Sequence, residues 1–465
     1  MTLGIDPGNV AGLSSQARRQ LSELLEVYRS HRSQNEQKAR YYEGKIPLRE
    51  VNLGLALPHG IAGLEIGCSW GANAVDVLAA RSMFDGFVTE TGESNPELDD
   101  IVKANRLCFE YSKAARDELK FGCDFATLTA DPAIGCKIRF HSPMGAAAVW
   151  DGDKGRIAYG LAVIDQAQSN VEDGRHWVPS IIHMYTDDYV WVMIRRDDYR
   201  WEATGYRHRM GRPLMEPLIW DATSAKPFGQ SRLKDRVRRL IQGYVRTVAN
   251  ASIGLEFATA PQKYMLGVTD EQYDALINTK FSTYVGSIIA ATVNPETGEK
   301  PSFGQLSQGN ISPHVEMMRI LSAQFSAATG LTVTDTGVVN DANPTSSDAI
   351  LAQSQTLVAK AQELNAGNAD GLRTIALMAL AISRNTTLDG LNDEDRQILA
   401  HFKNPAMPSV AVTADAAMKI ATARPGFGQT DVFLEMIGFD QAEIRRIRNQ
   451  EQRARGLQLV TELAE

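Results

Sequence analysis

The chain has 465 residues, of which 43% are hydrophobic and 22% charged, and its formal net charge is −8. A chain of this length can bury several cores without disulfides or metals and allows about three domains. Because the net charge is acidic, the chain is not a basic nucleic-acid coat protein, and any contact with DNA has to be local.

The N-terminal part predicts helices. One is expected from Ser14 or Ser15 to about Tyr42, and residues 95–120 also have a helical pattern. The cysteines lack CxxC spacing, so we expect reduced thiols in the core and no zinc or redox motif. They are Cys68, Cys108, Cys123 and Cys136.

From Gly122 the pattern changes to short strands rich in Tyr, Trp, Val and Ile, separated by Asp-Pro, Ser-Pro and Asp-Asp pairs. This predicts an antiparallel meander with a hairpin tip at Val171–Arg175. The aromatic residues between Tyr185 and Tyr206 are typical of one buried sheet face. A platform on which bases stack is the alternative.

The stretch Ser231–Phe257 predicts a long amphipathic helix. Its apolar residues fall on one arc: Leu233, Val237, Leu240, Ile241, Tyr244, Val245 and Val248. Its other face is basic, and Arg232, Arg236, Arg239 and Arg246 lie there. We expect Ser231 to cap the helix and Pro261 to stop it.

The remainder alternates turn-rich segments with capped helices. Residues 258–310 are irregular, with one strand-like run, FSTYVGSIIAATV. Ser312 and Pro313 predict the start of a helix that runs to Ala328, with Gly330 closing it. An irregular loop follows, then two separate helices, one from Pro344 to about Leu364 and one at Leu372–Ser383.

Catalytic motifs are scarce. The sequence lacks a P-loop, a Rossmann glycine pattern and a GxSxG elbow, and its eight histidines have no metal-ligand spacing. We therefore expect no cofactor, no metal and no enzymatic activity. The alternative is a hydrolase that uses Asp124, Asp131, Asp151 and Asp153, although Asp-Pro and Asp-Gly pairs are also ordinary turn chemistry.

Targeting segments are not expected either. The N-terminus has no basic stretch leading into an apolar one, which argues against a secretion signal. The longest apolar run, Ile375–Ile382, is too short to cross a bilayer.

Several runs resemble portal proteins of long-tailed bacteriophages, most closely those of phages of actinobacteria. They include PFGQSRLKDRVRRLIQGYVRTVANASIGLEFATAPQKYMLGV, FGQLSQGNISPHVEMMRILSAQFSAATGL and NDANPTSSDAILAQSQTLVAKAQEL. The upstream pieces VDVLAARSMFDGFV, ELKFGCDFATL and FHSPMGAAAVWD also look like that family. The pieces occur in family order and span about Tyr41 to Leu364.

The resemblance implies an α+β portal fold with a wing, a long-helix stem, a small clip and a helical crown. On this chain it implies an N-terminal arm and helix at 1–43, a wing at 44–230, stem helices at 231–257 and 312–330, a clip at 258–311, a tunnel loop at 331–343, wing-crossing helices at 344–400 and a crown at 401–465. The tunnel loop would consist of Leu331, Thr332, Val333, Thr334, Asp335, Thr336, Gly337, Val338, Val339, Asn340, Asp341, Ala342 and Asn343.

The same resemblance implies a homo-oligomeric ring, usually a dodecamer, at the portal vertex of the virion capsid, assembled in the host cytoplasm. Double-stranded DNA would pass through it without sequence preference during packaging and ejection. The terminase large subunit, a head-completion adaptor and the major capsid and scaffolding proteins would be its partners, with no membrane involved. A non-enzymatic capsid assembly adaptor remains a further alternative.

Physical considerations agree with this placement. Closing a ring requires different patches to meet on neighbouring subunits. A channel that moves DNA has to avoid many tight phosphate contacts, which suits the polar, uncharged Thr332, Thr334, Thr336 and Asn340. We expect Arg236, Arg239 and Arg246 to combine contacts to a neighbouring subunit with contacts to DNA.

Overall fold

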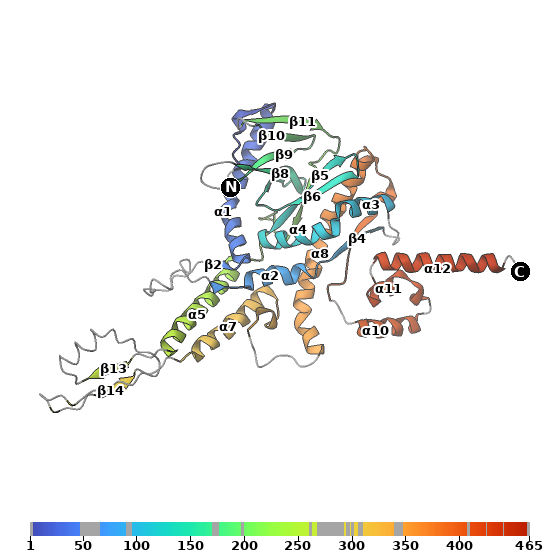
Figure 1. Cartoon of the computed structure of the whole chain (residues 1–465). Helices are drawn as coiled ribbons and strands as arrows, with labels where there is room; N and C mark the ends of the chain where they lie inside the picture. Colours follow the sequence, from blue (N-terminus) through green and yellow to red (C-terminus); the bar gives the residue numbers. More distant parts are fainter. Residues whose placement is uncertain are drawn as a thin grey trace.

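The computed structural model describes residues 3–46, 66–89, 95–169, 176–196, 200–259, 263–266, 293, 298, 302–305, 310–338, 347–406, 410–424, 426–439 and 441–462. The fold is mixed helix and sheet, which confirms the expected α+β class (Figure 1).

A six-stranded sheet forms the outer part of the body, in the order β1–β11–β10–β9–β8–β7. Its strands are β1 (Val10–Ala11), β7 (Ala146–Asp151), β8 (Arg156–Ser169), β9 (His176–Tyr185), β10 (Tyr189–Arg195) and β11 (Trp201–Arg207). β7 to β11 pair antiparallel in sequence order, so the predicted meander is confirmed. Ser169 pairs with His176 as in a hairpin, and the predicted tip, Val171–Arg175, lies outside the described residues.

The aromatic residues of this sheet divide between buried and exposed positions. Tyr185 and Trp201 are buried, whereas Tyr206 is 59% exposed. Tyr189 and Trp191 stack on each other, with ring centroids 5.4 Å apart. The prediction of a buried sheet face therefore holds for Tyr185 and Trp201 and is wrong for Tyr206.

Helix α1 (Ser15–Tyr42) covers the six-stranded sheet. The Ser14 hydroxyl accepts a hydrogen bond from the Ala17 N–H at 3.1 Å, which satisfies a free donor at the helix start. Leu21 and Leu24 of α1 are buried in one core with Leu161 and Ile182 of the sheet. The first predicted helix is confirmed at both ends.

A second sheet lies beneath the first and consists of β12 (Met215–Ile219), β5 (Cys123–Asp131) and β6 (Gly135–His141). Helices α3 (Pro96–Asn105), α4 (Leu107–Phe121) and α8 (Ser347–Ser383) share its core. Short strand pairs complete the body: β2 (Lys45–Ile46) with β3 (Ile66–Gly67), and β4 (Phe84–Thr89) with β15 (Ile398–Phe402).

The structure corrects the expected pair of helices after the loop. α8 is one continuous helix of 37 residues. Its two interior glycines do not interrupt it because they let it approach β12 closely: a Cβ on Gly371 would lie 3.1 Å from the Pro217 carbonyl oxygen. The expected start at Pro344 lies outside the described residues.

The burial of the cysteine side chains also differs in part from the prediction. All four cysteines are free, and Cys68, Cys123 and Cys136 are buried as predicted. Cys108 is exposed, because it lies on the outer side of α4, so its assignment to the core was wrong.

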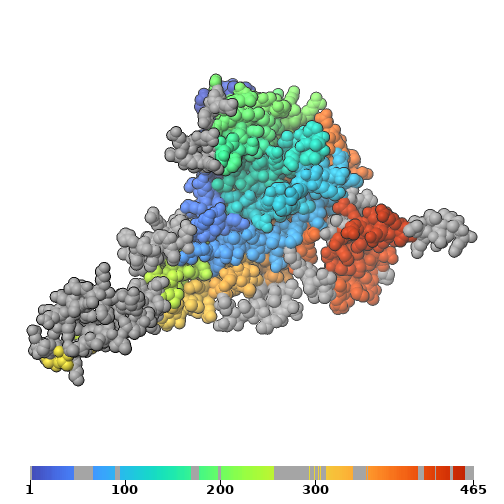
Figure 2. Space-filling model, in the orientation of Figure 1, coloured from blue at the N-terminus to red at the C-terminus, as the bar shows by residue number. Residues whose placement is uncertain are grey.

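Two protrusions leave the body on opposite sides (Figure 2). One contains α5 (Asp235–Thr259), α7 (Ser312–Thr329) and the antiparallel pair β13 (Lys263–Leu266) and β14 (Ser302–Gln305). The other contains α10 (Val410–Ala423), α11 (Asp431–Ile437) and α12 (Gln441–Glu462), and α9 (Asp393–Arg396) precedes it in the chain. Among the described residues no helix has the length and apolar character that a membrane span requires.

Short 3-10 turns complete the described elements. They are η1 (Pro7–Asn9), η3 (Thr334–Thr336), η4 (Leu388–Gly390) and η5 (Phe427–Gln429).

Candidate functional site

The first candidate site is the helical hairpin made by α5 and α7. Val237, Ile241 and Val245 of α5 are buried in one core with Leu321 and Phe325 of α7. Gly243 allows the close approach, since a Cβ there would lie 3.3 Å from Leu321. The predicted apolar seam of α5 is therefore confirmed.

The ends of both helices differ slightly from prediction. α5 begins at Asp235 and not at Ser231. Ser231 instead donates a hydrogen bond to the Lys120 carbonyl oxygen and accepts one from the Leu233 N–H, which anchors the entering chain. α7 begins at Ser312 with Ile311 as its N-cap residue, and Gly330, at φ 75°, ends it as predicted.

Arg232 does not belong to the exposed basic face. It is 7% exposed, and its guanidinium donates to the carbonyl oxygens of Ala74 in α2 (Trp70–Ala79) and of Thr329 in α7. Burial lowers the pKa of Arg232 to about 10. The guanidinium thus joins the hairpin to α2, and the interpretation of Arg232 as a surface residue is wrong.

The other three predicted arginines are exposed on α5. Arg239 forms a surface ion pair with Asp235 at 2.8 Å. Arg236 and Arg246 make no hydrogen bond or ion pair with any residue that the structure describes. The outer face of α5 therefore presents positive charge, as the sequence predicts.

α7 presents apolar side chains on its outer side. Val315, Met317 and Ile320 are 44%, 44% and 45% exposed. Single exposed apolar residues are ordinary, but three within six residues of one protruding helix form a patch that another surface can cover. The sequence pattern predicts one apolar face with Val315, Met318, Leu321 and Phe325, which is correct at the buried Leu321 and Phe325 and wrong at the exposed Val315.

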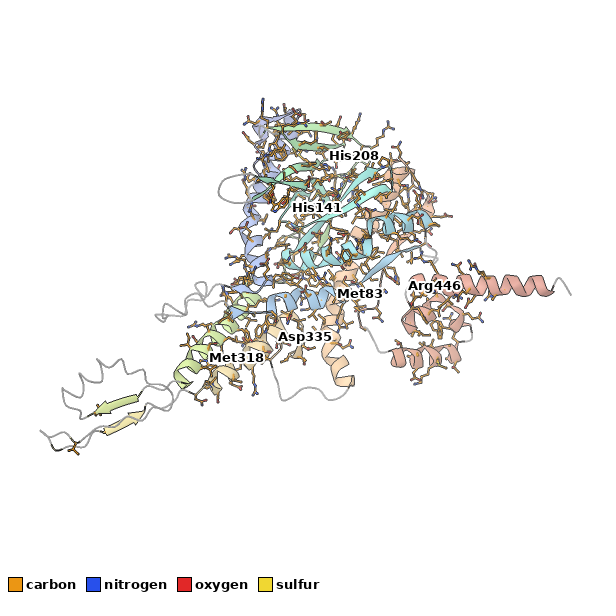
Figure 3. The ribbon with its side chains drawn as sticks, in the orientation of Figure 1. Met83, His141, His208, Met318, Asp335 and Arg446 are labelled. Atoms are coloured by element: carbon orange, nitrogen blue, oxygen red, sulfur yellow. The ribbon has the colours of Figure 1, made fainter. Side chains whose placement is uncertain are left out.

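The second candidate site is the segment after α7, residues 331–343. Its described part, residues 331–338, is a structured turn and not the irregular loop that the sequence predicts. Residues 334–336 form η3, which lies beneath α2. Trp70 Nε1 donates to the Thr336 carbonyl oxygen at 2.9 Å, and Asn73 Nδ2 donates to the Asp335 carbonyl oxygen at 2.7 Å. Figure 3 places Asp335 there, between α7 and α8.

Thr336 is buried within this turn, and its hydroxyl lies 2.6 Å from that of Ser322. Leu331 is buried as well, whereas Thr334 and Gly337 are exposed. Only part of the turn between residues 331 and 338 is exposed at the surface, because the buried side chains of Leu331 and Thr336 anchor it to the body. Val339 to Asn343, which include Asn340 and Asp341, lie outside the described residues.

Replacing Thr336 with Val is expected to lower the free energy of unfolding by about 1–2 kcal/mol, because the Ser322 hydroxyl loses its buried partner. Thermal unfolding with a circular-dichroism readout measures this. Thr334→Val, at an exposed position of the same turn, is expected to change the stability by less than about 0.5 kcal/mol. Equal effects of the two substitutions would contradict the packed turn.

The aspartates of the hydrolase alternative do not come together. Asp124 and Asp131 lie near opposite ends of β5, about 23 Å apart at the usual rise of a strand. Asp131 and Asp151 accept hydrogen bonds from backbone N–H groups two residues on, which is turn chemistry. No group of three or more His, Cys, Asp or Glu side chains suited to a metal occurs within the part of the chain that the structure describes.

Sequence reasoning missed that two carboxyl groups are buried, Glu118 of α4 and Asp124 of β5. Glu118 is fully buried, and its carboxylate accepts a hydrogen bond from Asn368 Nδ2 at 2.8 Å. Burial raises the pKa of Glu118 to about 8 and raises that of Asp124 well above its usual range. A single polar residue within a helical or strand pattern gives no sign of burial, so only the packing of the folded chain identifies these two groups.

No protein-family model matches the chain. No curated protein matches it either. Among solved structures, one chain described as "Neck of native GTA particle computed with C12 symmetry" aligns with a TM-score of 0.45 and 13% identity, over 80% of this chain and 89% of that one. Another, "Neck of empty GTA particle computed with C6 symmetry", has a TM-score of 0.45 and 15% identity, over 83% and 95% of the two chains.

Proposed function

We propose that this chain is the subunit of a portal-type ring, which forms a channel for double-stranded DNA at one vertex of a phage capsid. The observation that carries the proposal is the protruding hairpin of α5 and α7, with its apolar seam, its basic outer face and its distal strand pair. Its residues are those that the sequence resemblance assigns to the stem and the clip. The ring would have no enzymatic activity of its own, and the terminase would supply the energy.

The distribution of exposed apolar residues supports assembly. Most of the strongly exposed ones within the described chain belong to the two protrusions: Leu255, Leu266, Val315, Met317, Ile320, Met418, Ile420, Val432 and Phe439. The body has fewer. Apolar surface concentrated in this way is typical of an interface between subunits.

The domain assignments follow the same proposal. The stem would be α5 with α7, the clip would include β13 and β14, and the crown would include α10 to α12. The turn containing Thr334 would be the anchored half of the tunnel loop. The terminase, the head-completion adaptor and the capsid and scaffolding proteins would be the partners, in a virion.

Negative-stain electron microscopy and mass photometry of the purified protein test the proposal. We expect rings with a central hole. Compact particles without a hole, of one or two subunits at all concentrations, would contradict it and favour the assembly adaptor.

Replacing Ile320 with Asp is expected to lower the ring population about tenfold, because an unpaired charge would have to be buried between subunits. Size-exclusion chromatography with light scattering measures the ring population. Leu399→Asp is the matched control, since Leu399 is similarly exposed, at 43%, but lies on the body in β15. If both variants assemble like the wild type, the outer face of α7 is not an interface.

A further inference from the structure

The C-terminal helix α12 uses its arginines in two different ways. Arg445 pairs with Asp99 of α3, and Arg448 pairs with Asp431 of α11 at 2.6 Å. These two side chains fasten α12 to the rest of the chain. Their charge is therefore already matched within the subunit.

Another face of α12 has charge that no described residue of the subunit matches. Arg446, Asn449, Gln450 and Arg453 follow one another at i, i+3, i+4 and i+7 and are exposed. Within the described residues neither Arg446 nor Arg453 makes a hydrogen bond or an ion pair. Figure 3 places Arg446 near the beginning of this helix. We call these four residues the outer face of α12.

The turn between α8 and β15 has the complementary arrangement. Arg384 pairs with Glu97 at 2.8 Å and with Asp395 at 2.6 Å, which matches those two carboxylates within the subunit. Asp389, Asp393 and Glu394 remain exposed, and none of their side chains pairs with another described residue. We call these three residues the acidic turn.

We propose that the outer face of α12 of one subunit docks on the acidic turn of a second copy of this chain. The inference rests on the proposed ring. A ring closes through a heterologous interface, in which two different patches of the same chain meet, and these two patches have opposite charge. No hydrogen bond or ion pair between described residues joins the two patches within one chain, so both are free to meet a neighbour.

Two charge-reversed variants test this pairing. R446E/R453E makes the outer face acidic, and D393R/E394R makes the acidic turn basic. Each variant alone would bring like charges together, and we expect its ring population to fall about tenfold. Mixed in equal amounts, the two variants offer opposite charges at every contact in an alternating ring, and we expect assembly to return to the wild-type level.

Matched controls distinguish the pairing of these two patches from a general effect of changing the charge of the chain. Arg455 is exposed on the other side of α12, and Asp370 is exposed on α8. R455E and D370R are expected to assemble like the wild type. Circular dichroism of all variants is expected to show an unchanged fold.

Mass photometry of each variant and of the mixture gives distinct outcomes. If the wild type forms rings and the charge-reversed variants form them equally well, the proposed docking of α12 on the acidic turn is wrong, but the proposed ring is not contradicted. If R446E/R453E assembles normally but binds duplex DNA more weakly, the outer face contacts DNA and the docking is again wrong. A wild-type chain that stays monomeric at every concentration overturns both proposals.

Discussion

Replacing Arg232 with Met is expected to lower the free energy of unfolding by about 3 kcal/mol, because buried hydrogen bonds to a charged group are lost. The guanidinium donates to two carbonyl oxygens on different helices, Ala74 in α2 and Thr329 in α7. Thr329 keeps a second donor, Lys360 Nζ at 2.9 Å, so the loss is partial. Chemical denaturation followed by circular dichroism measures the change.

Arg239→Met is the control, because Arg239 lies seven residues further along the chain, in the first turns of α5, with its side chain 77% exposed. Its surface ion pair with Asp235 is worth little, so we expect a change below about 0.5 kcal/mol. If Arg232→Met were equally mild, Arg232 would not connect the hairpin to the body. The hairpin of α5 and α7 would then have to be held by its apolar seam.

This contrast shows where sequence reasoning succeeds on the hairpin and where it fails. Periodicity correctly predicted which residues of α5 are apolar and buried, because a period of 3.6 is a local property of the chain. It could not predict that Arg232 is buried. That depends on α2, which lies about 160 residues earlier in the sequence, and on the end of α7.

The same limit applies to the turn after α7. Its composition indicated a loop, and Gly330 correctly marked the end of the helix. Its anchoring depends on Trp70 and Asn73, and no pattern around either residue points to a partner more than 250 residues away. α8 shows the complementary case, since the sequence predicted two separate helices, and the close approach of Gly371 to β12 is visible only in the folded chain.

Between pH 5 and pH 9 the buried Glu118 carboxyl is expected to make the protein less stable as the pH rises. Its pKa is raised to about 8 in the folded chain from an ordinary value of 4.5, because burial disfavours the charged form. Between the unfolded value of 4.5 and the folded value of about 8, the folded state keeps a proton that the unfolded state has lost. Raising the pH through this interval therefore lowers the free energy of unfolding, by up to about 5 kcal/mol once the pH exceeds the folded pKa.

Glu118→Gln isolates this contribution. The glutamine stays neutral, and its side-chain oxygen can still accept the hydrogen bond from Asn368, so we expect the variant to match the wild type within about 1–2 kcal/mol at pH 5. At pH 9 we expect it to be more stable than the wild type by several kcal/mol. Burial raises the pKa of Asp124 in both proteins, and the Glu118 charge raises it further in the wild type, so the difference between their stability curves reports Glu118 together with its effect on Asp124.

The control is Glu110→Gln on the same helix, since Glu110 lies at the surface in an ion pair with Lys113. Its stability curve is expected to run parallel to that of the wild type. If the curves of Glu118→Gln and the wild type were also parallel from pH 5 to pH 9, the Glu118 carboxyl would be ionised in its buried position. It would then need a counter-charge, which no described side chain within hydrogen-bonding distance of its carboxylate supplies.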